Sequence, residues 1–238
     1  MHKLYDFMEA RERLGTVIVK TKLIHSPVFS EESGNEVYLK PENLQKTGSF
    51  KIRGAYNKIA KLSDEEKKKG VIASSAGNHA QGVAYAAKKL GIKAVIVMPQ
   101  HTPLIKVEAT RRYGAEVVLH GEVYDDAYKK ALELQKENGY IFVHPFNDEE
   151  VLEGQGTIAL EILDELPNAD IILVPLGGGG LVSGIACAAK LKNPQIKVIG
   201  VEPEGAASAL AALQKGEVVE LKEANTIADG TAVKRIGE

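Results

Sequence analysis

The stretch IILVPLGGGGLVSGIACAAKLK, residues 171–192, joins an apolar run to a helical segment through four consecutive glycines. Because residues 171–174 are all apolar, they are typical of a strand that is covered on both faces of a parallel sheet. A turn between a strand and a helix needs one or two glycines, whereas four allow the backbone to close around a phosphate at the helix N-terminus. The stretch therefore predicts an α/β unit with a phosphate-binding loop.

The alternation of short β-branched runs and amphipathic segments extends through the chain from residue 36 onward. Alternation of this length predicts βαβ units and a parallel or mostly parallel sheet with right-handed crossovers. Pro103 marks one helix start, and Gly91, Gly114 and Gly139 follow helix ends. We expect strands at 36–39, 71–73, 94–97, 116–119, 140–143, 171–174 and 197–201, and helices near 50–62, 78–90, 103–113, 123–138, 148–164, 181–192 and 204–215.

The composition is that of an ordinary soluble protein, with 44% hydrophobic and 26% charged residues among 238. A formal net charge of −2 gives no electrostatic reason to expect nucleic acid or a membrane surface as a partner. No apolar run approaches the roughly 20 residues of a spanning helix, and the N-terminus lacks the apolar core of a signal peptide. A single cysteine, Cys187, excludes an internal disulfide, so we expect a cytoplasmic protein.

A lysine stands in the second informative segment, KPENLQKTGSFKIRGA at residues 40–55. Ser49 is the expected N-cap of the following helix, which puts Lys51 in the first helical turn. The positive end of the helix dipole, together with apolar Phe50 and Ile52, lowers a lysine pKa. A neutral amine is the form that attacks a carbonyl carbon. Local sequence alone leaves a solvated surface lysine open as the alternative.

A third segment, SSAGNHAQG at residues 74–82, lies between an expected strand and a helix that begins near Asn78. Its small residues leave backbone N–H groups open at the helix N-terminus, which favours an anion site. Asn78 and Gln81 can donate hydrogen bonds to oxygen atoms of a ligand. An ordinary capped turn is the alternative, and a single His79 is more typical of a packed or surface histidine than of a catalyst.

The glycine-rich unit also suggests a nucleotide-binding module, because Glu202 follows it about 20 positions later. The G-x-G-x-x-G spacing fails, however. Val182 or Ser183 stands where the third glycine belongs, depending on which glycine begins the motif. Nucleotide binding is therefore a minor alternative.

Together the three segments resemble the fold-type II pyridoxal 5′-phosphate (PLP) enzymes, which are tryptophan synthase β-like, and specifically their threonine (serine) dehydratase branch. The similarity covers essentially the whole chain, with the motifs in the family's order. It implies two parallel or mostly parallel βαβ domains, with PLP held as a Schiff base on Lys51 beside Phe50, and Asn78 on the pyridine hydroxyl. It also assigns the phosphate site to Gly177, Gly178, Gly179, Gly180 and Leu181, and the grip on the substrate carboxylate to Ser75, Ala76, Gly77, His79 and Ala80.

The resemblance implies dehydration and deamination of L-threonine, L-serine or both to 2-oxobutanoate or pyruvate and ammonia, with Lys51 removing the Cα proton. Serine racemases carry a second serine where this chain has Ala76, so racemisation is an alternative, as is another β-elimination or β-replacement. Some relatives bind a divalent cation near Glu202, Ala206 and Ser208. Serine at 208 removes one carboxylate, so we expect no metal and leave Glu202 and Ala206 as weak candidates.

The same resemblance predicts a large PLP-binding domain at 1–68 and 152–238 and a small substrate-gripping domain at 69–151. In this family the hydrogen-bond partner of the pyridine nitrogen lies beyond residue 238. The large domain is therefore expected to be truncated, and a folded but non-catalytic fragment stays an alternative. The expected partners are a small amino-acid substrate and, in the full-length form, further copies of the chain in a dimer or tetramer. The expected pathway is isoleucine biosynthesis.

Overall fold

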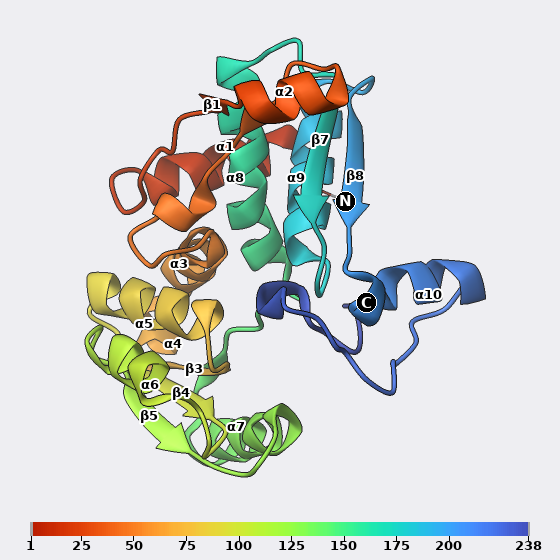
Figure 1. Ribbon diagram of the computed structural model, residues 1–238. Helices are drawn as coiled ribbons and strands as arrows, with labels where there is room; N and C mark the ends of the chain where they lie inside the picture. The colour runs from red at the N-terminus through yellow and green to blue at the C-terminus, as the bar shows by residue number, and fades with distance from the viewer. Residues whose placement is uncertain (1, 238) are drawn as a thin grey trace.

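Two parallel sheets form the framework of the protein in the computed structural model, which describes residues 2–237 (Figure 1). The larger sheet has the strand order β5-β4-β3-β6, and the smaller pairs β7 with β8. Every pairing in these two sheets is parallel, which confirms the α/β prediction. The strands are β3 (Val71–Ser74), β4 (Ala94–Met98), β5 (Glu116–Leu119), β6 (Ile141–Phe142), β7 (Ile171–Pro175) and β8 (Lys197–Val201).

The expected strand at 36–39 does not join either parallel sheet. It shortens to β2 (Tyr38–Leu39) and pairs antiparallel with β1 (Ile24–His25), which the sequence did not predict. The helix α2 (Pro27–Ser33) connects these two strands and was also missed. Its start carries an ordinary signal, because the Ser26 hydroxyl accepts from the Phe29 N–H at 3.5 Å and proline follows the cap.

The long helices lie close to where the sequence placed them. The sequence did not predict α1 (Leu4–Leu14) or α4 (Asp64–Lys69). Helix α1 nevertheless has Phe7, Ala10 and Leu14 buried at helical spacing. The predicted helices are α3 (Lys51–Lys61), α5 (Asn78–Leu90), α6 (Leu104–Arg111), α7 (Tyr124–Asn138), α8 (Glu149–Glu165), α9 (Gly180–Lys192) and α10 (Ser208–Lys215).

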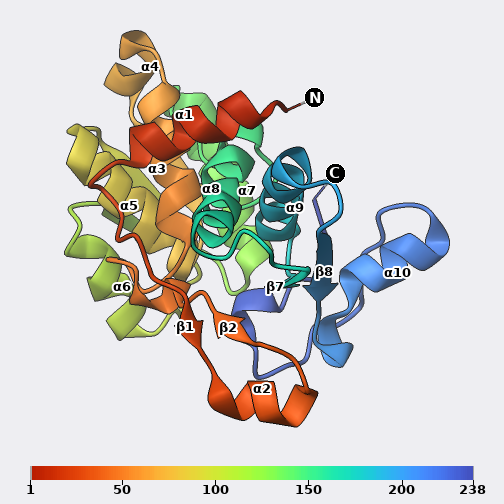
Figure 2. The same cartoon turned by 90° about the horizontal axis from the view of Figure 1, so that it is seen from above.

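Helix α8 lies between α3 and α9, and glycines allow close approach on both sides (Figure 2). A Cβ added at Gly54 of α3 would lie 2.5 Å from the side-chain nitrogen of Gln155. A Cβ added at Gly184 of α9 would collide with the Leu152 carbonyl oxygen. These contacts fix the start of α3 relative to the start of α9, and both starts contribute to the site described below.

A buried ionic cluster holds α3 against α8. Arg53 is 0% exposed and contacts the carboxylates of Glu42 and Glu161, each at 2.7 Å. Lys40 adds a second cation 2.7 Å from Glu161. Burial opposes the charge on Arg53, but the two carboxylates outweigh it and raise the pKa of the guanidinium. Because breaking one partner of such a cluster leaves an uncompensated buried charge, the cluster firmly holds the first turn of α3.

Among residues 2–237, no helix has both the length and the apolar character that crossing a bilayer requires.

Candidate functional site

Lys51 is the first residue of α3 and so lies in the first turn, where the sequence placed it, but Ser49 does not cap the helix. The N-cap position is Phe50, whose backbone is already helical, and the Arg53 N–H bonds the Phe50 carbonyl at 3.0 Å. This tight first turn satisfies a donor that a serine cap would otherwise bind. The Ser49 hydroxyl is buried and has no hydrogen-bond partner among the described residues.

The Lys51 amine has no carboxylate neighbour within ion-pair distance in the described part of the chain. Its Nζ donates to the Pro145 carbonyl at 2.9 Å and lies 5.3 Å from the centre of the Phe50 ring. Burial lowers the pKa of the amine to about 8. The neutral form, which a carbonyl-binding lysine requires, is therefore far more populated near neutral pH than for an exposed lysine.

Residues 177–181, here called the glycine loop, follow β7 and include the first two residues of α9. They share a cavity of about 50 Å³ with Phe50 and Lys51. Gly179 is the N-cap of α9 and has a φ of 98°, which a residue with a side chain rarely adopts. The structure therefore brings Lys51 and the glycine loop together, although 126 positions separate Lys51 from Gly177 in the sequence.

The predicted carboxylate loop runs into the first turn of α5, and α5 packs beside the start of α3. A Cβ added at Gly82 would lie 3.1 Å from the Lys51 carbonyl oxygen. Asn78 is exposed and lies one turn before Gly82, on the same face of α5. Ser75, Ala76 and Gly77 are half-buried, whereas His79 and Ala80 are buried. Neither Asn78 nor any residue from Ser75 to Ala80 lines the cavity shared by Lys51 and the glycine loop.

Sequence reasoning missed four residues of that cavity, which are Phe146, Pro175, Gly230 and Thr231. A Cβ added at Gly178 would collide with the Phe146 ring, and one at Gly180 would lie 2.8 Å from the Phe146 Cα atom. Phe146 follows β6 at the carboxyl end of a parallel strand. Ligands of α/β proteins bind at that edge, so this position was the available signal.

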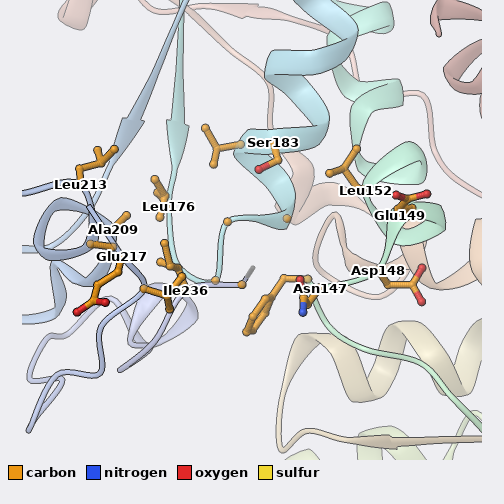
Figure 3. A pocket seen from close by; sticks show the side chains of 18 of the residues that line it. Asn147, Asp148, Glu149, Leu152, Leu176, Ser183, Ala209, Leu213, Glu217 and Ile236 are labelled. Atoms are coloured by element: carbon orange, nitrogen blue, oxygen red, sulfur yellow. The ribbon is translucent and has the colours of Figure 1, made fainter. Parts of the chain in front are cut away.

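A larger cavity of about 630 Å³ borders the glycine loop (Figure 3). Phe146 and residues 178–180 line both cavities, but Lys51 lines only the smaller one. Figure 3 shows Leu176 and Ser183 on the lining of the larger cavity. Because the Phe146 ring borders both spaces, a shift of this ring would enlarge the space beside Lys51.

The donors of the smaller cavity fit a phosphorylated aldehyde cofactor. Lys51 offers an amine with a lowered pKa, and the glycine loop offers backbone N–H groups at the N-terminus of α9. A volume of about 50 Å³ is below the ~300 Å³ of a typical small-molecule site, so the cavity must widen when such a group binds.

Glu202 acts as a cap of α10. Its carboxylate accepts the N–H groups of Ala209 at 2.8 Å and Leu210 at 3.0 Å. Ala206 is buried in the turn before this helix. The expectation that no metal binds at Glu202 and Ala206 stays a prediction.

Comparison with known proteins decides the family. The family described as "Pyridoxal-phosphate dependent enzyme" matches residues 15–238. The chain belongs to this pyridoxal-phosphate-dependent family. The resemblance drawn from the three segments is confirmed, and so is the fold-type II architecture.

Relatives of this PLP-dependent chain include the L-threonine ammonia-lyase of Thermotoga maritima, which is 55% identical over 100% of this chain and 59% of that protein. Threonine deaminase isoform 2 from Solanum lycopersicum, in its processed form, matches with a TM-score of 0.94 at 44% identity, over 99% of this chain and 69% of that one. Maize serine racemase matches with a TM-score of 0.95 at 39% identity, over 99% and 71%. The chain thus spans about six tenths of the length of the first curated relative.

Proposed function

We propose that this chain carries the reaction centre of a PLP-dependent ammonia-lyase that converts L-threonine, L-serine or both to 2-oxobutanoate or pyruvate and ammonia. The observation that carries the proposal is the Lys51 amine, which has a pKa lowered to about 8 and shares a cavity with the glycine loop. The threonine ammonia-lyase and threonine deaminase named above support the choice of reaction.

Each predicted site residue has a role in this proposal. Bound PLP supplies an electron sink that stabilises the carbanion left when the Cα proton departs. Lys51 anchors the cofactor, and its amine, with a pKa about 8, accepts the Cα proton near neutral pH. The start of α5 favours an anion, which suits a substrate carboxylate. Ser75, Ala76, Gly77, His79 and Ala80 form that carboxylate loop, Asn78 contacts the pyridine hydroxyl, and residues 177–181 bind the phosphate.

The experiment compares Lys51→Ala with Lys46→Ala, because Lys46 is an exposed lysine of the same segment. We expect Lys51→Ala to abolish both keto-acid formation and the visible absorption band that appears when PLP is added. Lys46→Ala should keep both. Borohydride reduction followed by peptide mapping checks the assignment, and a pyridoxyl label on a lysine other than Lys51 would sink it. A wild-type chain that shows no band with added PLP would favour the non-catalytic fragment.

Serine racemisation is the second candidate, because maize serine racemase is a close structural match. Ala76 has no proton-bearing side chain, so it cannot return a proton to the face of the cofactor opposite Lys51. Incubating the wild-type chain with PLP and L-serine, and assaying both pyruvate and D-serine, separates ammonia-lyase activity from racemisation. We expect pyruvate with little D-serine, and substantial D-serine would put racemisation first.

The remaining proposals concern organisation. We propose a large domain at 1–68 and 152–238 and a small domain at 69–151. All four strands of the larger sheet, β3 to β6, fall within the proposed small domain. We also propose a cytoplasmic homo-oligomer, a dimer or tetramer in the full-length form, that acts in isoleucine biosynthesis. Exposed apolar side chains on β7 and β8 support the oligomer.

A further inference from the structure

One short segment contacts all three parts of the site. This crossover segment, residues 143–147, leads from β6 to α8. The Val143 N–H bonds the Ile72 carbonyl at 2.9 Å, so the segment starts as a continuation of the sheet. The His144 Nδ1 then accepts the N–H of Asn147 at 2.8 Å, which closes a turn around Pro145 and Phe146. The backbone of the crossover segment is therefore held at both ends.

Three side chains or loops meet the crossover segment in order. The His79 Nε2 lies 2.8 Å from the Val143 carbonyl oxygen. The Lys51 Nζ donates to the Pro145 carbonyl at 2.9 Å. The Phe146 ring packs against Gly178 so closely that an added Cβ would collide with it. The start of α5, the start of α3 and the glycine loop are thus connected through four consecutive residues.

The geometry at His79 identifies its tautomer. A carbonyl oxygen only accepts hydrogen bonds, so the Nε2 atom must carry the proton. The ring is 3% exposed, and the Nδ1 has no partner among the described residues. Burial, followed by the charge of Lys51, lowers the pKa of His79 to about 3, so the ring stays neutral under physiological conditions. His79 therefore acts as a fixed N–H donor and not as a proton shuttle.

We propose that His79 is a positioning residue for Lys51: its Nε2–H fixes Val143 and, through the crossover segment, the Pro145 carbonyl that receives the Lys51 amine. This inference rests on the proposed role of Lys51. It gives the His79 side chain a task behind the predicted carboxylate loop, on the side of the crossover segment.

The Pro145 carbonyl matters because the other neighbours of the amine carry no charge. The Phe50 ring faces it from α3, His79 from α5 and His144 from the crossover segment. Burial and Lys51 also lower the pKa of His144, to about 4, so both imidazoles are neutral at pH 7. A carbonyl that accepts from an ammonium favours the charged form and offsets part of the effect of burial. Displacing this carbonyl should therefore lower the pKa of Lys51 further.

The experiment measures that pKa in the whole chain without added cofactor or substrate. Lysines are reductively methylated with ¹³C-formaldehyde, and Lys51→Arg identifies the signal of Lys51 by its disappearance. We compare His79→Leu, which cannot donate, with His79→Gln, whose side-chain N–H can reach the Val143 carbonyl. The titration midpoint of Lys51 should fall by about one pH unit in the leucine variant. In the glutamine variant it should stay close to the wild-type value.

A wild-type midpoint in His79→Leu overturns the proposal, because a purely structural role would lower the stability in urea without moving the titration of Lys51. If the leucine variant does not fold, ¹⁵N spectra of the wild-type histidines decide. A proton on Nε2 of His79 supports the proposal, and a proton on Nδ1 overturns it. Since neither measurement uses PLP or threonine, a chain without keto-acid activity would contradict the proposed function and leave this result intact.

Discussion

Two cations in the first turn of α3 have opposite surroundings. Arg53 is paired with two carboxylates, which raise the pKa of its guanidinium. Lys51, two positions earlier, donates to the Pro145 carbonyl beside the Phe50 ring and has no carboxylate partner among the described residues. Because ion pairing keeps the charge of a cation and burial without an anion disfavours it, Arg53 is suited to hold the helix and Lys51 to react.

The lowered pKa of Lys51 predicts how the rate of PLP attachment depends on pH. Only the neutral amine attacks an aldehyde, so the rate should rise with pH up to about 8, the pKa of this group, and then level off. An exposed lysine would give a rate that keeps rising towards pH 10. The measurement is the rate at which the visible band appears after PLP is added, at pH values from about 6.5 to about 9.5. A rate that still climbs steeply above pH 9 would show that Lys51 is not perturbed.

The residues that sequence could find are those with a chemical signature in the chain. Lys51 lies at an expected helix start between apolar Phe50 and Ile52, and four consecutive glycines indicate an anion-binding loop. Pro145 was not predictable, because it contributes a backbone carbonyl that every residue has. For Phe146 the sequence offered only its position after a parallel strand, because its packing against Gly178 depends on tertiary structure. The prediction that Ser49 caps α3 was wrong, because the Phe50 carbonyl accepts the N–H that the Ser49 hydroxyl was expected to bind.

At the scale of elements, the ends of helices carry the site and their glycines set how closely they approach. The starts of α3 and α9 face one cavity because α8 packs against both through Gly54 and Gly184. Strand–helix alternation predicted the order of these elements, since buried parallel strands are apolar and helix ends carry glycine. It did not predict β1 or α1. The pairing of β1 spans only two residues, which is too short for a periodic signal.

The glycine loop gives a prediction with a matched control. Gly179 and Gly91 both have positive φ, 98° and 68°, and an added Cβ meets nothing within 4 Å at either. Alanine at each should lower the free energy of unfolding by about 1 kcal/mol through backbone strain. Only Gly179→Ala should also weaken PLP binding, by roughly tenfold, because the strain shifts the N–H groups that face the phosphate. Absorbance titration with PLP and urea unfolding provide the two readouts.

Equal PLP affinity in Gly179→Ala and Gly91→Ala would place the phosphate elsewhere. Gly178→Ala adds a second arm, because its Cβ collides with the Phe146 ring instead of straining the backbone. We expect this variant to weaken PLP binding as well, since the displaced ring must find new space beside the loop. A loss of affinity in Gly178→Ala alone would indicate that the position of Phe146, and not the backbone of Gly179, limits binding.

At the scale of the whole molecule, the small sheet is covered on one face only. Ile172 and Val174 of β7 are buried beneath the helices. Their neighbours point the other way, with Leu173 at 65% and Ile199 of β8 at 44% exposure. Sequence predicted a strand covered on both faces from the apolar run at 171–174, and the described residues cover only one. We therefore expect a partner on the uncovered face, because parallel sheets in α/β proteins are usually buried on both sides.

This face predicts self-association of the 25.6 kDa chain that depends on concentration. Leu173 and Ile199 are directly paired across β7 and β8, so the double variant Leu173→Lys/Ile199→Glu places opposite charges side by side and should preserve the sheet. We expect it to sediment as a smaller species than the wild type and to bind several-fold less of an apolar dye. The control Leu104→Lys/Ile105→Glu removes two exposed apolar side chains from α6, where no sheet face is open, and should sediment like the wild type. A wild-type chain that stays monomeric at every concentration would contradict the prediction. Equal effects of the two double variants would show that association depends on the total exposed apolar surface and not on the open face of β7 and β8.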